Sequence, residues 1–252
     1  MQKMYMYAKR FYKIVILFFV VIIIFVLFIS ARKLYSNADF GKTFGAKATV
    51  AENKLGAMEQ SFKLCSAVTR CNVNFMQSLV FPEVMRYNAL KDGIESESLK
   101  ILYVQFGEEY ADFSIGIFQM KPSFAEQVEK KCRQLLPANI YNELQLNYEE
   151  KNEENIRARR LERLMDDDWQ LIYLSGFIAI CNTIYIYKTF VNEAEKLQWY
   201  STVYNAGFDK TDGYISKKIT ESNFYLSLQM PGKKFEYAAI ASYYFTKPAA
   251  SK

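Results

Sequence analysis

The alternation of hydrophobic and polar positions along the chain predicts helices and no amphipathic strand. Apolar side chains recur three or four positions apart in most segments, which is the spacing of one face of an α-helix. The clearest segments run from Asn74 to Leu90, from Ser123 to Leu136, from Glu193 to Phe208 and from Phe235 to Phe245. About six to eight helices are expected by this criterion. The predicted fold class is therefore mainly α.

Two further segments are more extreme in composition. Residues from Tyr148 to Asp168 carry charges of both signs at helical spacing, which predicts a solvated helix with many ion pairs and no site. The run from Trp169 to Phe190 is apolar and aromatic, so it fits either a second membrane span or a central core helix. Polar residues inside it, such as Gln170, favour the core helix.

The N-terminus has the pattern of a membrane-targeting segment. Basic residues up to Lys13 precede an apolar run from Ile14 to Ile29, and Arg32 closes it, with 18 residues between the two flanking cations. Basic residues before such a run keep the N-terminus in the cytoplasm and send the rest of the chain outward. The run is either an uncleaved anchor or a signal peptide cleaved after Ala31 or Ala38.

The expected organisation follows from these patterns. Residues 1–34 form a signal anchor or transmembrane segment, 35–60 a tether, 61–246 one helical domain and 247–252 a polar tail. The protein is then expected in the cell envelope, either anchored in the inner membrane and facing the periplasm or exterior, or secreted if the segment is cleaved.

Charge and composition narrow the chemistry. The 32 basic residues nearly balance the 27 acidic ones, so the net charge of +5 favours polyanions only weakly, and no nucleic-acid partner is expected. The chain has no His, which excludes Ser-His-Asp and Cys-His catalysis and disfavours a zinc site. No metal or cofactor is expected, and acid–base chemistry has to rest on carboxylates, Tyr, Lys or Cys. Four cysteines permit either disulfides or buried free thiols: Cys65, Cys71, Cys132 and Cys181.

The segment from Ala111 to Phe124 has the pattern of a tight turn that leads into a helix. Gly116 interrupts an apolar run, and glycine permits a positive φ or a close approach of the backbone. Gln119, Met120 and Lys121 then precede Pro122, and proline suits the first turn of a helix.

This segment also resembles a known family. Residues 116–122 read GIFQMKP, and residues 204–207 read YNAG. Lytic transglycosylases and goose-type lysozymes carry a G-L-M-Q-x-M-P block after the catalytic Glu and a Y-N-A-G block further on. The resemblance covers the chain from about Phe62 to Phe245. It implies a lysozyme-like helical domain that acts on peptidoglycan glycan strands.

Glu83 is the candidate catalytic residue, because it follows a largely apolar helical stretch as the family's Glu does. A carboxyl at the edge of an apolar helix loses hydration, which raises its pKa and keeps it protonated near neutral pH, as a general acid requires. Pro82 is expected to kink or restart the helix. The alternative is a surface Glu83 paired with Arg86.

A second carboxyl competes for this role. Glu95 is followed by Ser96, which reproduces the family's Glu-Ser pair, whereas Val84 follows Glu83. Glu83 is correct if an additional helix covers about Ile94 to Phe106, and Glu95 becomes the better candidate if that insertion is absent.

The resemblance implies further substrate-binding residues. Gln119, Tyr204 and Asn205 would hold or polarise the sugar, with Tyr204 near the catalytic Glu. Met120, Lys121 and Ser114 would also contact the substrate, although Lys121 replaces the family's Met.

Together these features favour a peptidoglycan lytic transglycosylase that cleaves the β-1,4 bond between N-acetylmuramic acid and N-acetylglucosamine and leaves a 1,6-anhydro end. A hydrolytic muramidase would need a second carboxylate, for which Asp92, Asp112 and Asp209 are candidates. A non-catalytic glycan-binding scaffold of an envelope complex is the third possibility. Expected partners are the glycan strands, the inner membrane through the N-terminal segment, and unidentified proteins of an envelope complex.

Overall fold

The structure of the protein is a computed structural model that describes residues 22, 44–226 and 234–248. The predicted N-terminal anchor therefore lies outside the described residues, apart from Ile22. The described part of the chain is mainly helical, as predicted. Its extended pairings are two isolated antiparallel bridges, Ile115–Met120 and Phe224–Phe235.

Residues 44–57 are helical and lead into ten further helices along the described ranges. These are α2 (Glu59–Thr69), α3 (Val73–Arg86), α4 (Ala89–Phe106), α5 (Pro122–Leu135), α6 (Ala138–Leu144), α7 (Glu153–Leu164), α8 (Asp167–Ile184), α9 (Glu193–Ala206), α10 (Asp212–Lys218) and α11 (Tyr237–Phe245).

Short polar side chains fix where many of these helices begin. In α3, Asn72 accepts a hydrogen bond from the backbone N–H of Phe75, and the same arrangement recurs in five other helices. Such caps satisfy one of the backbone donors that the first turn leaves without a partner. The other capping residues are Asn88, Asn152, Asp166, Asn192 and Thr211.

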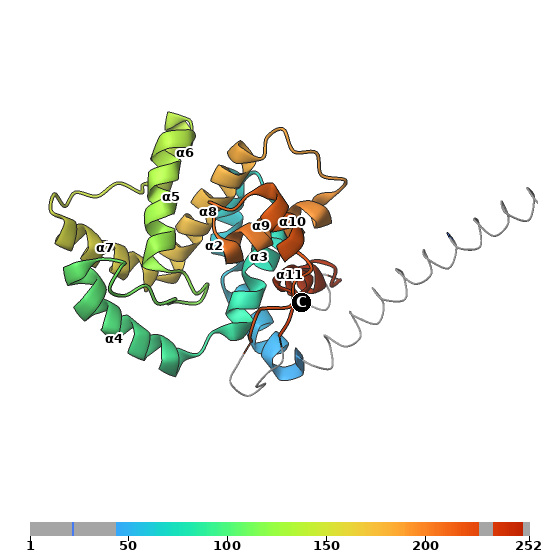
Figure 1. The fold of residues 1–252 in the computed structure, drawn as a ribbon, viewed down its shortest axis with the longest axis horizontal. Coiled ribbons are helices and arrows are strands. Elements are labelled where there is room, and N and C mark those ends of the chain that lie inside the picture. Colours follow the sequence, from blue (N-terminus) through green and yellow to red (C-terminus); the bar gives the residue numbers. More distant parts are fainter. Residues whose placement is uncertain (1–21, 23–43, 227–233, 249–252) are drawn as a thin grey trace, which may run out of the picture. The chain divides into compact units, whose positions relative to one another are not determined.

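α8 is the central helix of the domain formed by residues 46–252. It packs against α2, α5, α6, α7 and α9, and its middle residues from Gln170 to Cys181 are buried apart from a half-buried Ile172. Figure 1 shows α4, α5 and α7 on one side of it and α3, α9, α10 and α11 on the other. The prediction of a core helix at Trp169–Phe190 is therefore confirmed, although the helix ends at Ile184. Within the described ranges, no helix combines the length and apolarity needed to cross a bilayer.

Gly176 lets α5 approach α8 closely. A Cβ at this position would lie 2.9 Å from Cγ1 of Val128 and 3.0 Å from Sγ of Cys132, both on α5. These distances are shorter than ordinary van der Waals contact, so a larger side chain would push the two helices apart.

The expected tether differs from the structure over residues 44–57. Ala48, Ala51 and Leu55 are buried at spacings of three and four, and the side-chain N–H of Gln77 donates to the carbonyl of Leu55. Small alanines carry little hydrophobic signal in the sequence, yet they let this helix pack closely.

α7 also differs from the expected solvated helix. Arg160 is 7 % exposed, and its guanidinium contacts Glu129 at 2.7 Å, Glu126 at 2.8 Å and the hydroxyl of Tyr103 at 2.6 Å. Tyr173 of α8 also donates to Glu129. This Arg160 cluster joins α4, α5, α7 and α8, because a buried charge requires opposite charges and hydrogen-bond partners around it.

All four cysteines are free thiols, so the structure corresponds to the second alternative left open by the sequence. Cys71, Cys132 and Cys181 are buried, and Cys65 is half-buried. Burial raises the pKa of the Cys132 thiol to about 12, because the thiolate would lose its hydration.

Candidate functional site

Glu83 lies inside the last turn of α3 and is 4 % exposed. α3 packs against α2, α9 and α11, and every residue from Phe75 to Met85 is buried. The helix continues through Pro82, so the expected restart is absent. Proline removes only the hydrogen bond to the carbonyl of Ser78, and this extensive burial holds the helix together.

Among the residues that the structure describes, the carboxyl of Glu83 has one close cationic partner. Nη2 of Arg86 lies 2.6 Å from Oε2 of Glu83, and the two residues are three positions apart on α3. The alternative from the sequence, a surface Glu83 paired with Arg86, is correct about the pair. It is wrong about the surface, because the Glu83 side chain is only 5 % exposed. Burial raises the pKa of Glu83 from 4.5 to about 7, and the positive charges of Arg86 and Lys91 oppose that shift.

Two buried tyrosines lie beside Glu83. The hydroxyl of Tyr204 on α9 donates to the carbonyl of Phe118 at 2.9 Å, and that of Tyr237 on α11 donates to the carbonyl of Leu79 at 3.2 Å. Burial raises the pKa of both tyrosines, and the negative charge of Glu83 raises it further. The helices α3, α9 and α11, which carry Glu83, Tyr204 and Tyr237, pack on one another, so the three side chains belong to one region of the core.

The predicted turn before Pro122 lies next to this group. Ile115 and Met120 exchange backbone hydrogen bonds of 2.9 and 3.0 Å around it. Gly116 has φ +72°, and a Cβ there would lie 1.4 Å from Nε2 of Gln170. Gln119 has φ +50°, and its side-chain amide donates to the carbonyl of Gly116 at 2.9 Å. The turn is thus fixed from within, and Tyr204 attaches it to α9.

The other predicted substrate-binding residues are less closely grouped. Met120 is 1 % exposed, so its side chain belongs to the core. Lys121 is exposed and pairs with Asp112 at 3.3 Å, Ser114 is half-buried, and Asn205 is exposed at the end of α9. The structure therefore brings Glu83, Tyr204 and the Gly116–Gln119 turn together, and it places the remaining side chains around them.

The rival acid Glu95 lies on α4. This helix covers the range where an additional helix was expected, and it begins at Ala89, five residues before the predicted start. Glu95 pairs with Lys91 at 3.2 Å, and its side chain is 17 % exposed. The positive charge of Lys91 also lowers the pKa of Glu83, so this lysine acts on both carboxyls.

The candidate second carboxylates have other partners in this structure. Asp92 accepts a hydrogen bond from the N–H of Gly116 at 2.6 Å and thereby ties α4 to the turn. Asp112 accepts from the N–H and the hydroxyl of Ser123 and so caps α5. Asp209 is largely exposed and lies 3.7 Å from Lys131.

Sequence reasoning missed two members of the site. Tyr237 belongs to a segment that was interpreted only as a packing face, and its contact with α3 spans 158 positions. Lys91 lies in the first turn of α4, where the sequence predicts only an ordinary charged residue on the helix surface. The spacing of Glu83 and Arg86 was the one local signal that could have predicted the electrostatic control of the carboxyl.

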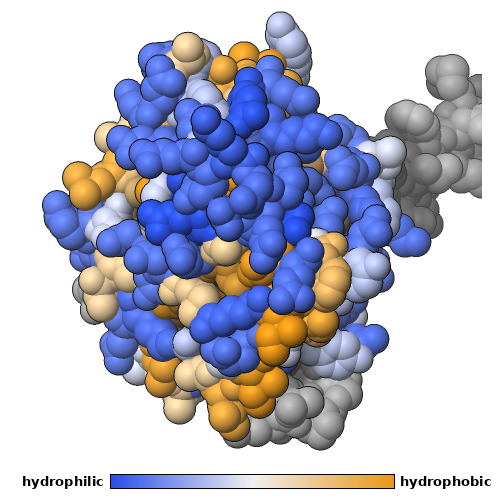
Figure 2. All heavy atoms as spheres, turned by 90° about the vertical axis from the view of Figure 1, so that its left-hand side faces the viewer, coloured by the Kyte–Doolittle hydropathy of each residue, from blue (hydrophilic) through white to orange (hydrophobic). Residues whose placement is uncertain are grey.

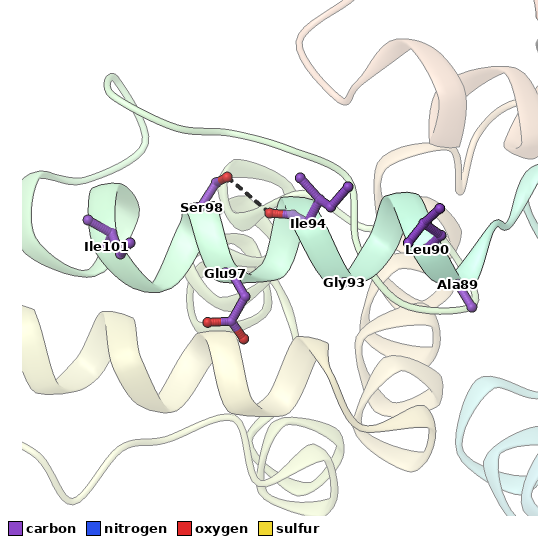
Figure 3. A pocket seen from close by; sticks show the side chains of 7 residues that line it. All are labelled: Ala89, Leu90, Gly93, Ile94, Glu97, Ser98 and Ile101. Carbon is purple, nitrogen blue, oxygen red and sulfur yellow. Dashed lines mark hydrogen bonds between the residues drawn. The ribbon is translucent and has the colours of Figure 1, made fainter.

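Two cavities of the domain lie elsewhere. One of about 540 Å³ follows the outer face of α4, and Figure 3 shows that its seven lining side chains all come from that helix. Figure 2 looks onto this side of the domain, where hydrophobic residues gather below a hydrophilic upper part. Leu90, Ile94 and Ile101 are each more than 60 % exposed. The other cavity, of about 480 Å³, lies between α2, α8 and the α5–α6 connection.

Within residues 44–226 and 234–248, no group of three His, Cys, Asp or Glu side chains is arranged to hold a metal ion. Comparison of the chain with protein-family models, with curated protein sequences and with solved structures finds no match.

Proposed function

We propose that the protein is a peptidoglycan lytic transglycosylase with a lysozyme-like helical domain. The observation that carries this proposal is the buried Glu83, whose pKa is raised to about 7. A carboxyl in this environment is partly protonated at neutral pH, and it can therefore both donate and accept a proton. The resemblance of residues 116–122 and 204–207 to the family's two blocks supports the substrate class.

The chemistry follows from one carboxyl used twice. Protonated Glu83 donates its proton to the glycosidic oxygen, the C1–O bond of N-acetylmuramic acid breaks, and the N-acetylglucosamine end leaves as an alcohol. The Glu83 carboxylate then removes the proton from the C6 hydroxyl of the same muramic acid, whose oxygen bonds to C1. The product is a 1,6-anhydro end, and Glu83 regains its proton. This sequence needs neither a water nucleophile nor a second carboxylate.

The surroundings of Glu83 suit these two steps. The hydroxyl of Tyr204 and the turn that contains Gln119 are held together by the hydrogen bond to Phe118. Groups that are held in place need no reorganisation when a sugar binds. In the proposed role, Gln119, Tyr204 and Asn205 bind the sugar, and Ser114 and Lys121 contact it at the more exposed edge.

The test is digestion of purified peptidoglycan by the full-length chain in detergent, with mass spectrometry of the products. We expect anhydro ends from the wild type and a loss of rate of about 10²–10⁴-fold in Glu83→Gln, which keeps the size of the side chain but cannot transfer the proton. Glu97→Gln is the matched control, because Glu97 is an exposed residue of α4 that pairs with Lys100. It should retain wild-type activity.

Other outcomes would replace the proposal. Reducing ends would show that water attacks, so that a carboxylate such as Asp92 must activate it and the protein is a muramidase. Glycan binding without cleavage by the wild type would identify a non-catalytic scaffold. Equal loss of activity in Glu83→Gln and Glu95→Gln would contradict the assignment of Glu83 as the sole acid.

A further inference from the structure

Arg86 is the more exposed member of the ion pair with Glu83. Its side chain is 31 % exposed, whereas that of Glu83 is 5 % exposed, and the two groups are 2.6 Å apart. The guanidinium also lies 5.0 Å from the ring centroid of Phe224. Arg86 is thus held between a buried carboxyl and an aromatic face, at the last residue of α3.

The contact between the two groups is an ion pair that leaves hydrogen-bonding capacity unused. Among the described residues, Nε of Arg86 is a buried atom without a hydrogen-bond partner, whereas Oε2 of Glu83 has Nη2 of Arg86 at 2.6 Å. Buried polar atoms in native proteins normally have such a partner. The arrangement therefore holds the charges together and leaves Nε of Arg86 able to form a further bond.

We propose that Arg86 is a positioning residue for Glu83, which holds the carboxylate in place and limits how readily it takes up the proton that it donates as an acid. This inference rests on the proposed function and deepens it. In the first step Glu83 must carry a proton, and a neighbouring cation opposes protonation. In the second step Glu83 must be a carboxylate, which the cation stabilises. The arginine thus opposes the protonated form that the first step uses and favours the carboxylate that the second step uses.

The other titratable groups near Glu83 are less suited to this role than Arg86. Lys91 of α4 also favours the Glu83 carboxylate, but it is ion-paired with Glu95 at 3.2 Å. Tyr204 of α9 and Tyr237 of α11 remain neutral at physiological pH, since burial raises their pKa. Their hydroxyls donate to backbone carbonyls.

The burial of Glu83 separates this pair from ordinary surface ion pairs. An exposed pair of the same spacing changes little when one partner is removed, because water takes its place. Removal of Arg86 would leave the Glu83 carboxylate buried without its closest cation, and a carboxyl in that position takes up a proton instead.

The test is a titration of Glu83 that does not depend on activity. The full-length chain is labelled with [¹³Cδ]glutamate, and the Glu83 signal is identified by its loss in Glu83→Gln. In Arg86→Gln the titration midpoint should rise by at least about one pH unit, a tenfold change in the protonation equilibrium. Arg159→Gln is the control, because Arg159 and Glu162 form an exposed pair with the same separation of three residues. It should leave the midpoint unchanged.

Cleavage kinetics separate positioning from a purely structural role. The alkaline limb of the profile of kcat/KM against pH should move upward in Arg86→Gln with the titration midpoint. Arg86→Lys keeps the charge but loses the planar guanidinium, so we expect a midpoint near that of the wild type with a lower kcat. This variant also serves as the test if Arg86→Gln does not fold.

An unchanged midpoint in folded Arg86→Gln, or wild-type kcat and pH profile in Arg86→Lys, would overturn the proposal. A wild-type protein that does not cleave glycan would overturn the proposed function instead. The midpoint in Arg86→Gln would then decide separately whether Arg86 controls the protonation of Glu83.

Discussion

Glu83 shows how one buried residue makes the stability of a protein depend on pH. Its pKa rises from 4.5 in an unfolded chain to about 7 in the folded protein, mainly because burial removes water from the carboxylate. Between these two values the folded state binds more protons than the unfolded state. The free energy of unfolding therefore falls as pH rises through this window.

We expect Glu83→Gln to remove this dependence. The wild type should lose up to about 3 kcal/mol of stability between pH 4.5 and pH 7.5 from this group alone, at 1.36 kcal/mol per pKa unit. Urea denaturation of both proteins at several pH values measures the difference. Glu83→Gln should become more stable relative to the wild type as pH rises, and a constant difference would contradict the raised pKa.

Gly116 occupies a position where any side chain would destabilise the fold. Alanine there would have to adopt φ +72° and place its Cβ 1.4 Å from the Gln170 side chain and 2.7 Å from the carbonyl of Leu164. We expect Gly116→Ala to lower the free energy of unfolding by about 2–4 kcal/mol, the sum of backbone strain and overpacking.

Gly93→Ala is the matched control for that substitution. Gly93 lies within α4, and a Cβ there would meet nothing within 4 Å. We expect it to stabilise the protein by about 0.5–1 kcal/mol, because alanine favours the helix. Thermal and urea denaturation measure both, and equal effects of the two substitutions would contradict the account of the turn.

Among the helices, α7 is tied to α4, α5 and α8 through the Arg160 cluster. Arg160→Met would leave Glu129 buried without its cation and should lower the free energy of unfolding by about 3–5 kcal/mol. Arg159→Met removes an exposed pair one residue away and should not shift the denaturation midpoint measurably. Similar losses in both variants would show that helix propensity, and not the cluster, is responsible.

The helices that sequence analysis predicted well have local signals at their ends. α5 begins at Pro122, and α9 lies between a capping Asn192 and Gly207 at φ +97°. Proline, asparagine and glycine act there through their own backbone geometry, which the sequence displays directly. The spacing of their apolar residues likewise predicted that these segments are helices.

The features that sequence analysis failed to predict depend on contacts between residues that are distant in the sequence. Arg160 has the same sequence surroundings as the exposed Arg159, and its burial follows from Glu126 and Tyr103 on other helices. Glu83 was predicted as a partly dehydrated carboxyl from its apolar neighbours. The electrostatic influence of Lys91 and the position of Tyr237 required the folded arrangement.

For the whole molecule, the location of the chain remains a prediction from its first 34 residues. The apolar run from Ile14 to Ile29 between basic residues predicts one span, with residues 46–252 outside the cytoplasmic membrane. Fractionation should recover the protein with membranes, and protease added from the periplasmic or outer side should digest the domain. A shorter soluble form would show that the run is cleaved as a signal peptide.

Helix α11 has a consequence for the protein during its synthesis. α11 packs on α3 and α9, and Tyr237 reaches the carbonyl of Leu79 from 158 positions away. A growing chain that ends before residue 237 lacks the helix that encloses Glu83, so its carboxyl stays hydrated and keeps ordinary acidity. The ability of Glu83 to hold a proton at neutral pH therefore arises only after α11 has been made and has packed on α3. Under the proposed function, a chain interrupted during synthesis or export would not have the acid that cuts the cell wall.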